Sequence, residues 1–143
     1  MRPLVLCLAV LLAVAPAGLD AAWDRFDDQV VDWPCLTVPR MRVVDSLPNG
    51  WWGSYRLGIV TVRSDAPWWA AMHEFAHHLW TVCHIDRRPV GARFLAAVHS
   101  PSWGVREREW FAATLTWMLT GKGRQDIRRQ AAWTLDPLIT ETR

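Results

Sequence analysis

The stretch Ala71–Trp80, AMHEFAHHLW, places three histidines and one glutamate in a run that is otherwise apolar. A helix that buries one face against a core seldom carries so many polar groups, so these side chains need a chemical explanation. His73 and His77 are four residues apart, which on a helix puts both rings on one face, one turn apart. Two neutral imidazoles at this separation can both reach one tetrahedral metal ion at about 2.0–2.1 Å.

Glu74 follows the first of these histidines and completes the spacing H-E-x-x-H over residues 73–77. We expect its carboxylate to lie beside the metal instead of on it, where it can act as general base for a bound water. The frequencies of histidine and glutamate in this chain predict about 0.005 chance occurrences of the pattern. We therefore interpret it as a Zn²⁺ site with Glu74 as the catalytic residue of a hydrolase.

A catalytic zinc needs a third protein ligand and keeps one coordination position open. The continuation H-x-x-G-x-x-H is absent here, because Trp80 and Cys83 occupy the glycine and final histidine positions. A carboxylate from the later apolar helix is the expected substitute. Both Glu107 and Glu109 are available on that helix, and Glu141 lies near the end of the chain.

The segments HEFAHHL (residues 73–79) and EWFAA (residues 109–113) together resemble the gluzincin metallopeptidases, in which a second helix supplies a glutamate ligand. In particular they resemble the catalytic core of anthrax lethal-factor-type proteases, which carry an HEFGH motif and a later E-F-F-A segment. The resemblance covers roughly residues 53–120. It implies a zinc-dependent metalloendopeptidase with Glu109 as the third ligand. Glu107 is the alternative third ligand.

The sequence departs from that family before the second helix, where SPSWG (residues 100–104) stands in place of a tyrosine that assists catalysis. Trp103 in this segment has an N–H donor but cannot relay a proton. His99 and Tyr55 are the remaining candidates for stabilising the oxyanion, although each is more commonly a surface or packing residue. The resemblance further implies that an extended peptide or protein substrate pairs with the strand at residues 59–63.

The first 22 residues are typical of an export signal, because a single arginine precedes an eleven-residue apolar run and small residues follow it. Cleavage is expected after Ala17 or after Ala22. The apolar run is shorter than the about 20 residues that a membrane span needs, so no stable span is expected after cleavage. An uncleaved N-terminal anchor is the alternative. The sequence thus predicts a secreted domain of residues 23–143.

Two cysteines, Cys35 and Cys83, remain after removal of the predicted signal. In an exported protein this even number favours a disulfide. Because the bridge would close a long loop, the chain-entropy estimate gives it about 4 kcal/mol of stabilisation. Two buried free thiols are the alternative.

The chain has room for one ordered domain: it has 143 residues, of which 51% are hydrophobic and 21% charged. Its net charge of +2 is too small to indicate nucleic acid as a partner. Residues 23–34 are acidic and are expected to be weakly helical at best. The pattern then predicts a β-rich segment, a turn, one strand or two hinged at Gly58, a helix, a short helix or strand, and two further helices. These lie at residues 35–47, 48–53, 54–64, 64–83, 92–98, 105–119 and 124–138.

The order of these elements predicts an α+β fold. Together with the resemblance it predicts a small zincin-like domain. In that domain a short N-terminal β-sheet precedes the active-site helix, the glutamate-ligand helix and a C-terminal helix.

A non-catalytic binding module is a second hypothesis, from a different class of protein. The chain has eleven tryptophans, and several of them could form an aromatic platform for a glycan or a peptide. These are Trp51, Trp52, Trp68, Trp69, Trp103 and Trp110. A zincin that keeps its metal but has lost activity lies between the two hypotheses. Only the catalytic hypothesis explains the glutamate beside His73.

Overall fold

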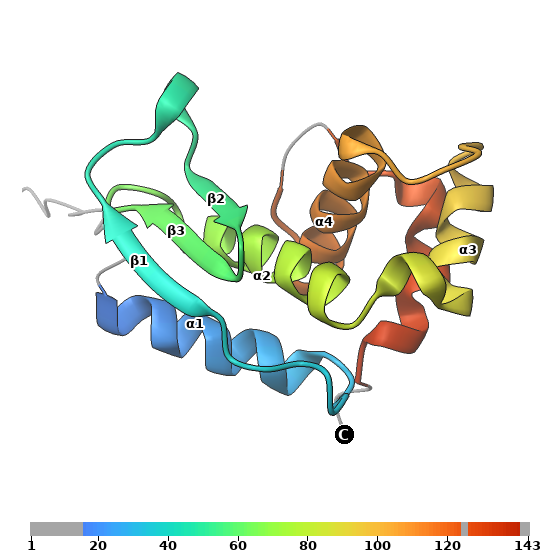
Figure 1. Cartoon of the computed structure of the whole chain (residues 1–143), viewed down its shortest axis with the longest axis horizontal. Coiled ribbons are helices and arrows are strands. Elements are labelled where there is room, and N and C mark those ends of the chain that lie inside the picture. Colours follow the sequence, from blue (N-terminus) through green and yellow to red (C-terminus); the bar gives the residue numbers. More distant parts are fainter. Residues whose placement is uncertain (1–15, 124–125, 141–143) are drawn as a thin grey trace, which may run out of the picture.

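A central helix, α2, separates a small β-sheet on one side from a group of helices on the other (Figure 1). The computed structural model describes residues 16–123 and 126–140. In chain order the elements are α1 (Pro16–Gln29), β1 (Arg40–Val44), the 3₁₀ segment η1 (Pro48–Gly50), β2 (Gly53–Arg56), β3 (Ile59–Arg63), α2 (Trp68–Val82), η2 (Ile85–Arg87), α3 (Pro89–Ala97), α4 (Val105–Thr120) and the 3₁₀ segment η3 (Arg129–Leu138). The predicted α+β class is confirmed, while the finer zincin-like assignment stays a prediction.

The N-terminal helix α1 was not predicted, and the expectation that residues 23–34 are weakly helical at best was wrong. The buried side chains of α1 and the residue after it recur with helical periodicity along one face. They are Leu19, Ala22, Trp23, Phe26 and Val30. This helical pattern of apolar residues begins at Leu19, so the domain boundary predicted after residue 22 divides it.

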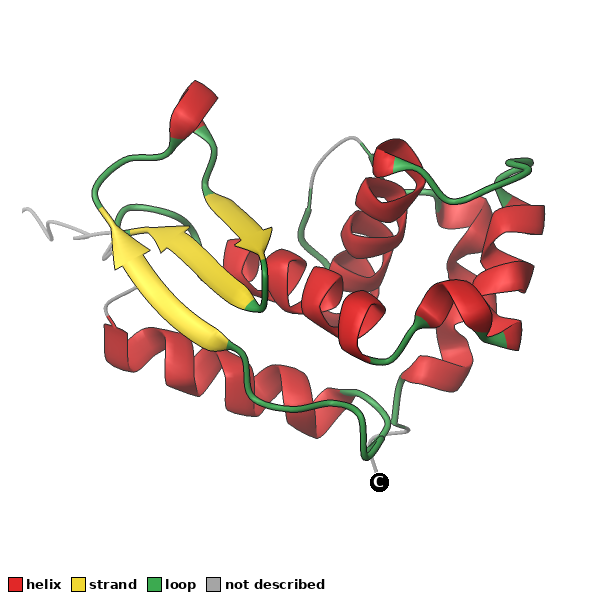
Figure 2. Ribbon diagram, in the orientation of Figure 1, coloured by secondary structure: helices red, strands yellow, loops and turns green. Residues whose placement is uncertain are grey.

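The sheet has the strand order β1-β3-β2, with β1 parallel and β2 antiparallel to β3. Of the two alternatives for residues 54–64, two strands joined near Gly58 are confirmed. Leu57 and Gly58 form the connection and have φ values of 51° and 77°, as a tight turn matched to the twist of the strands requires. In Figure 2 the three strands lie together at one end of the molecule, while α3, α4 and η3 gather at the other.

The predicted helix over residues 64–83 is present as α2, which begins four residues later than expected, at Trp68. Its N-cap is Pro67, without a side-chain hydrogen bond. Asp65 instead forms an ion pair with Arg63, so it does not cap the helix. Phe75 and Leu79 of α2 are buried, while Val82 is only partly buried.

Aromatic side chains fill the core on both sides of α2. On the sheet side, the Phe75 ring meets Trp23 edge-on at 5.1 Å and lies 5.7 Å from Phe26. On the other side, Phe94 lies 5.9 Å from Phe111 and packs also against the Trp103 ring. These contacts hold α2 between α1 and the later helices.

The C-terminal segment returns to the first helix. The predicted helix at 124–138 is partly present as η3, although residues 124 and 125 lie outside the described part of the chain. The Val31 amide donates to the Leu138 carbonyl at 2.9 Å, and the Thr140 amide donates to the Gln29 carbonyl at 3.0 Å. Among residues 16–123 and 126–140, no helix combines the length and hydrophobicity of a bilayer span. The apolar run of the predicted export signal lies outside these residues.

A disulfide joins Cys35 to Cys83, with 5.2 Å between the two Cα atoms, as predicted. It ties the segment before β1 to the C-terminal end of α2. Arg88 reinforces this junction, because its Nε donates to the Cys83 carbonyl at 2.6 Å and its guanidinium lies 4.2 Å from the centre of the Trp33 ring. The end of α2 is therefore fixed independently of the sheet.

Cleavage after Ala22 would give a chain that begins at Trp23, and cleavage after Ala17 a chain that begins at Gly18. The chain that begins at Trp23 is expected to be less stable, because it lacks the buried Leu19 and Ala22. Burial of one leucine contributes about 1.5–3 kcal/mol, so the free energy of unfolding should fall by at least about 2 kcal/mol. Urea denaturation of the two chains measures the difference. Equal stability of the two chains would contradict this expectation. If the longer chain is the more stable one, N-terminal sequencing of the exported protein should find cleavage after Ala17.

The double variant Cys35→Ala/Cys83→Ala is expected to lose about 2–5 kcal/mol of unfolding free energy, because its unfolded chain is no longer constrained. Guanidinium denaturation of the oxidised parent, the reduced parent and the variant measures the loss. The reduced parent is the control and should resemble the variant. If all three unfold at the same midpoint, the bridge does not stabilise the fold.

Candidate metal centre

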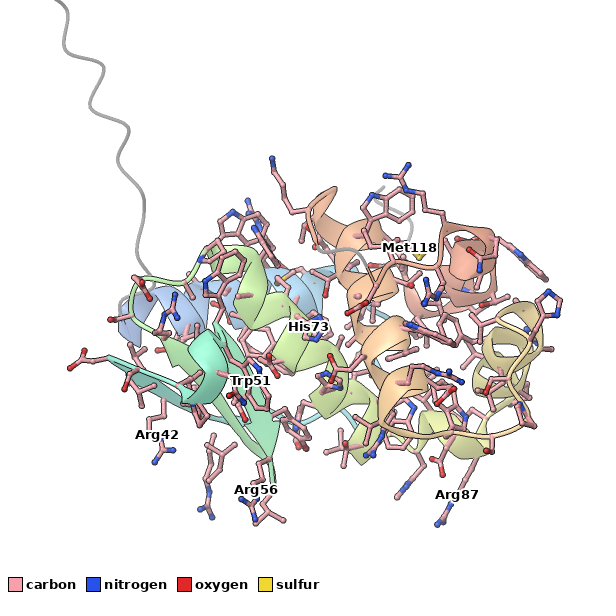
Figure 3. The ribbon with its side chains drawn as sticks, turned by 90° about the horizontal axis from the view of Figure 1, so that it is seen from above. Arg42, Trp51, Arg56, His73, Arg87 and Met118 are labelled. Carbon is pink, nitrogen blue, oxygen red and sulfur yellow. A yellow bond between two sulfur atoms is a disulfide. The ribbon has the colours of Figure 1, made fainter. Side chains whose placement is uncertain are left out.

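His73 and His77 of α2 meet the carboxylate of Glu109 of α4. Figure 3 shows His73 near the centre of the molecule as seen from above. The Nε2 atom of His73 lies 3.1 Å from Oε2 of Glu109. The Nε2 atom of His77 lies 3.0 Å from Oε1 of the same carboxylate and 3.2 Å from Nε2 of His73. The structure thus brings together the three residues that the sequence selected as ligands.

The separation of these atoms fits a metal ion. The ligand atoms of a tetrahedral zinc, with bonds of about 2.0–2.1 Å, lie about 3.3 Å from one another. The Nε2 atoms of His73 and His77 are 3.2 Å apart, and one ligand atom from each of the three residues lies within 4.8 Å of the others. The side chains of His73, His77 and Glu109 are 22%, 14% and 46% exposed, so solvent or a substrate can reach the group. The group could therefore hold a metal ion and leave one position open.

The three side chains are strongly coupled electrostatically. Burial alone would raise the pKa of Glu109, but the hydrogen bonds from the two imidazoles lower it well below its usual range. Burial lowers the pKa of His73, and the hydrogen bond with Glu109 and the nearby carboxylates outweigh this effect, so its pKa is raised. Binding of a metal ion would need neutral imidazoles, so it would compete with protonation of His73.

Glu107, the alternative third ligand, has a different role. Its Oε2 accepts the backbone N–H of Gly104 at 3.1 Å, and its Oε1 accepts the hydroxyl of Ser100 at 3.0 Å. Hydrogen bonds from Arg106, with those of its own backbone and of Ser100, lower the pKa of Glu107 to about 2. Glu107 caps the N-terminus of α4, which leaves Glu109 as the carboxylate beside the histidines.

Glu74 is buried, with 7% of its surface exposed, and lines the same cavity as the two histidines. Its carboxylate lies against the backbone of Gly53 in β2, where a Cβ atom would come within 2.7 Å of Oε1. Burial raises the pKa of Glu74, although the charges of His73 and His77 oppose the shift. A carboxyl group with a raised pKa is suited to accept a proton and return it near neutral pH.

The site opens into a cavity of about 990 Å³ between β2, α2 and α4. This volume is at the upper end of the about 300–1,000 Å³ that small-molecule and cofactor sites occupy. One wall is the continuous run of residues 51–58. The lining residues of α2 include Trp69, Ala70, His73, Glu74, His77 and Trp80, and those of α4 are Val105, Arg108, Glu109, Ala113 and Thr116.

The expectation that residues 59–63 pair with an extended substrate was wrong. These residues form β3, the central strand, whose two edges are already hydrogen-bonded to β1 and β2. Within the described part of the chain, β2 pairs only with β3 and so has one free edge. Because β2 also lines the cavity, it is the strand that can accept an extended chain there.

The oxyanion candidates have different surroundings. His99 does not line the cavity, and Trp103 is packed in the aromatic core. Tyr55 lines the cavity, with its hydroxyl 3.2 Å from Nδ1 of His78. The Nε2–H of His78 donates to the Thr37 carbonyl at 2.6 Å, and burial lowers the pKa of His78. The Tyr55 hydroxyl therefore donates its hydrogen bond to Nδ1 of a neutral His78.

Arg108 and Gly53 belong to the site but were not predicted. Arg108 shares a helical face with Val105 and Glu109, and this spacing was a usable signal. A charged residue at a helix surface is usually solvated, so the signal was weak. The close approach of Gly53 to Glu74 depends on strand placement, which no local pattern indicates.

Comparison of the chain with protein-family models, with curated proteins and with solved structures gives no match. The chemistry of the site must therefore be argued from its own residues and geometry.

The variants His73→Gln and Glu109→Gln are each expected to weaken binding of a divalent metal ion by at least about 100-fold, because loss of an outer-shell partner alone costs about 10–100-fold. Metal content by mass spectrometry and competition with a chelator measure the effect. His99→Asn is the matched control, since it lies outside the cavity and asparagine tolerates the φ of 55° found there. Equal metal content in all four proteins would contradict the assignment.

Proposed function

We propose that this chain is a secreted zinc-dependent metallopeptidase that hydrolyses peptide bonds with Glu74 as general base. The supporting observation is the group of His73, His77 and Glu109, whose ligand atoms all lie within 4.8 Å of one another, with Glu74 buried in the same cavity. The proposal agrees with the resemblance of the two motifs to gluzincin peptidases.

The donor set favours zinc. Imidazole nitrogens and a carboxylate oxygen suit a borderline cation, and structural zinc sites usually have four protein ligands that include cysteine. Both described cysteines are engaged in the disulfide instead. Zinc in this place would supply a Lewis acid for the substrate carbonyl and lower the pKa of the attacking water.

Glu74 would take up the proton of the attacking water and return it to the leaving amine. Its side chain is not part of the ligand group, since it is held on the β2 side of α2 against Gly53. A module that only binds metal has no need for a buried carboxyl group at this position.

An extended peptide is the substrate that the walls favour. The free edge of β2 offers backbone N–H and C=O groups, which pair with any peptide regardless of its side chains. The residues from Trp51 to Gly58 all line the cavity, so a paired chain would pass over the metal group.

Export to an oxidising compartment is supported by the Cys35–Cys83 disulfide, since such bonds are rare in reducing cytosol. The predicted signal at residues 1–22 is the other support.

A non-catalytic binding module is the second candidate, because Trp51, Trp52 and Trp69 line the cavity. The remaining members of the predicted platform pack elsewhere. Trp110 lies between Arg106 and Arg128, at 4.7 and 4.0 Å from their guanidinium carbons. The tryptophans at the cavity are equally useful to a peptidase, so they do not favour binding over catalysis.

Glu74→Gln is expected to retain zinc and to lose at least about 100-fold in peptide cleavage, as general-base catalysis contributes about 10²–10⁴-fold. Zinc per chain and cleavage of casein or a quenched peptide are measured on the parent and the variant. Equal residual cleavage in both would point to a contaminating protease and contradict the role of Glu74. Absence of zinc from both would favour the binding module.

A further inference from the structure

We propose that the cavity recognises two different groups of a peptide, one on each side of the metal centre. An aromatic or other bulky apolar side chain would bind at Trp52 and Trp69, and an acidic group would bind at Arg108. This inference rests on the proposed peptidase function and adds a substrate class to it.

The order of residues along α2 places the two regions on opposite sides of the metal group. Trp69, His73, His77 and Trp80 follow one another at intervals of four, four and three residues, and all four line the cavity. At about 1.5 Å per residue, the backbone distance from Trp69 to Trp80 is about 16 Å. An extended peptide covers this distance with about five residues. The metal group lies close to the middle.

The aromatic region is formed by Trp52 and Trp69, whose rings meet edge-on with centroids 5.1 Å apart. Trp51 next to them is 52% exposed and also lines the cavity. Trp69 is partly exposed and lines the cavity, so its ring can contact a third aromatic or apolar group. Asp126 also lines the cavity.

The cationic region is formed by Arg108, one residue before the carboxylate ligand. Its Nε donates to the Gly104 carbonyl at 3.3 Å, and its guanidinium carbon lies 5.3 Å from the centre of the Trp80 ring. Within residues 16–123 and 126–140, neither terminal nitrogen of Arg108 has a hydrogen-bond partner. The side chain is thus oriented by two contacts while its outer N–H groups stay available for a carboxylate.

Among the described residues Glu109 forms no ion pair with Arg108, and its carboxylate oxygens contact the imidazoles of His73 and His77 instead. The cavity therefore has an aromatic region at Trp52 and Trp69 and a cationic region at Arg108. A peptide with an aromatic and an acidic residue four or five positions apart would match both regions.

The test uses full-length zinc-loaded Glu74→Gln, which binds peptides without hydrolysing them. Octapeptides with Phe and Glu five positions apart, in both orders, are compared by calorimetry with analogues in which Lys replaces Glu or Ala replaces Phe. One order is expected to bind at least 10-fold more tightly than both analogues. Adding Arg108→Gln should abolish the preference for Glu over Lys, and Arg108→Glu should invert it. Trp69→Ala should abolish the preference for Phe over Ala.

Arg93→Gln on the exposed side of α3 is the matched control and should leave both preferences unchanged. Zinc content and circular dichroism verify that each variant is folded. Equal binding of the Glu and Lys peptides, or a preference that survives Arg108→Glu, would overturn the inference, as would binding of neutral oligosaccharides but no peptide. If the parent binds zinc and shows the preference without cleaving any peptide, the inference stands and the hydrolase proposal fails.

Discussion

The contact of one carboxylate with two imidazoles is the interaction on which the rest of the structure depends. Glu109, His73 and His77 are ionisable side chains in a partly buried place, and each would be costly there without the others. Their charges compensate one another only if the face of α2 that carries His73 and His77 is turned toward the face of α4 that carries Glu109. The apolar faces of the same helices, with Phe75 and Phe111 fully buried, fix that crossing from within the core.

The histidine pair and its glutamate could be predicted because their arrangement is local. A helix alone brings residues 73 and 77 to one face, whatever the remainder of the chain does. The choice between Glu107 and Glu109 is not local. The two differ by about 200° around α4, so only one can face α2, and the helix period does not show which face packs there. The resemblance to gluzincins selected Glu109, and the position of Glu107 as a helix cap gives the physical reason.

The arrangement of the strands could not be predicted because it depends on distant partners. The strands were located from composition, but their order depends on the parallel pairing of β1 with β3, which no local pattern encodes. This pairing makes β3 central and leaves β2 at the edge, and it reverses the expected place of a bound peptide. The helix α1 was missed for another reason: its apolar period continues across the boundary set at residue 22, so neither part showed it alone.

The backbone of β2 forms one wall of the cavity and also positions Glu74, the proposed general base. Because a Cβ atom at Gly53 would come within 2.7 Å of Glu74, β2 can approach α2 this closely only where it has no side chain. The next residues of β2 carry the free edge, and Tyr55 secures the strand to α2 through its hydrogen bond with His78. A shift of β2 would therefore displace its free edge and the Glu74 carboxyl group together. In the proposed peptidase, peptide binding and proton transfer would both depend on the position of this one short strand.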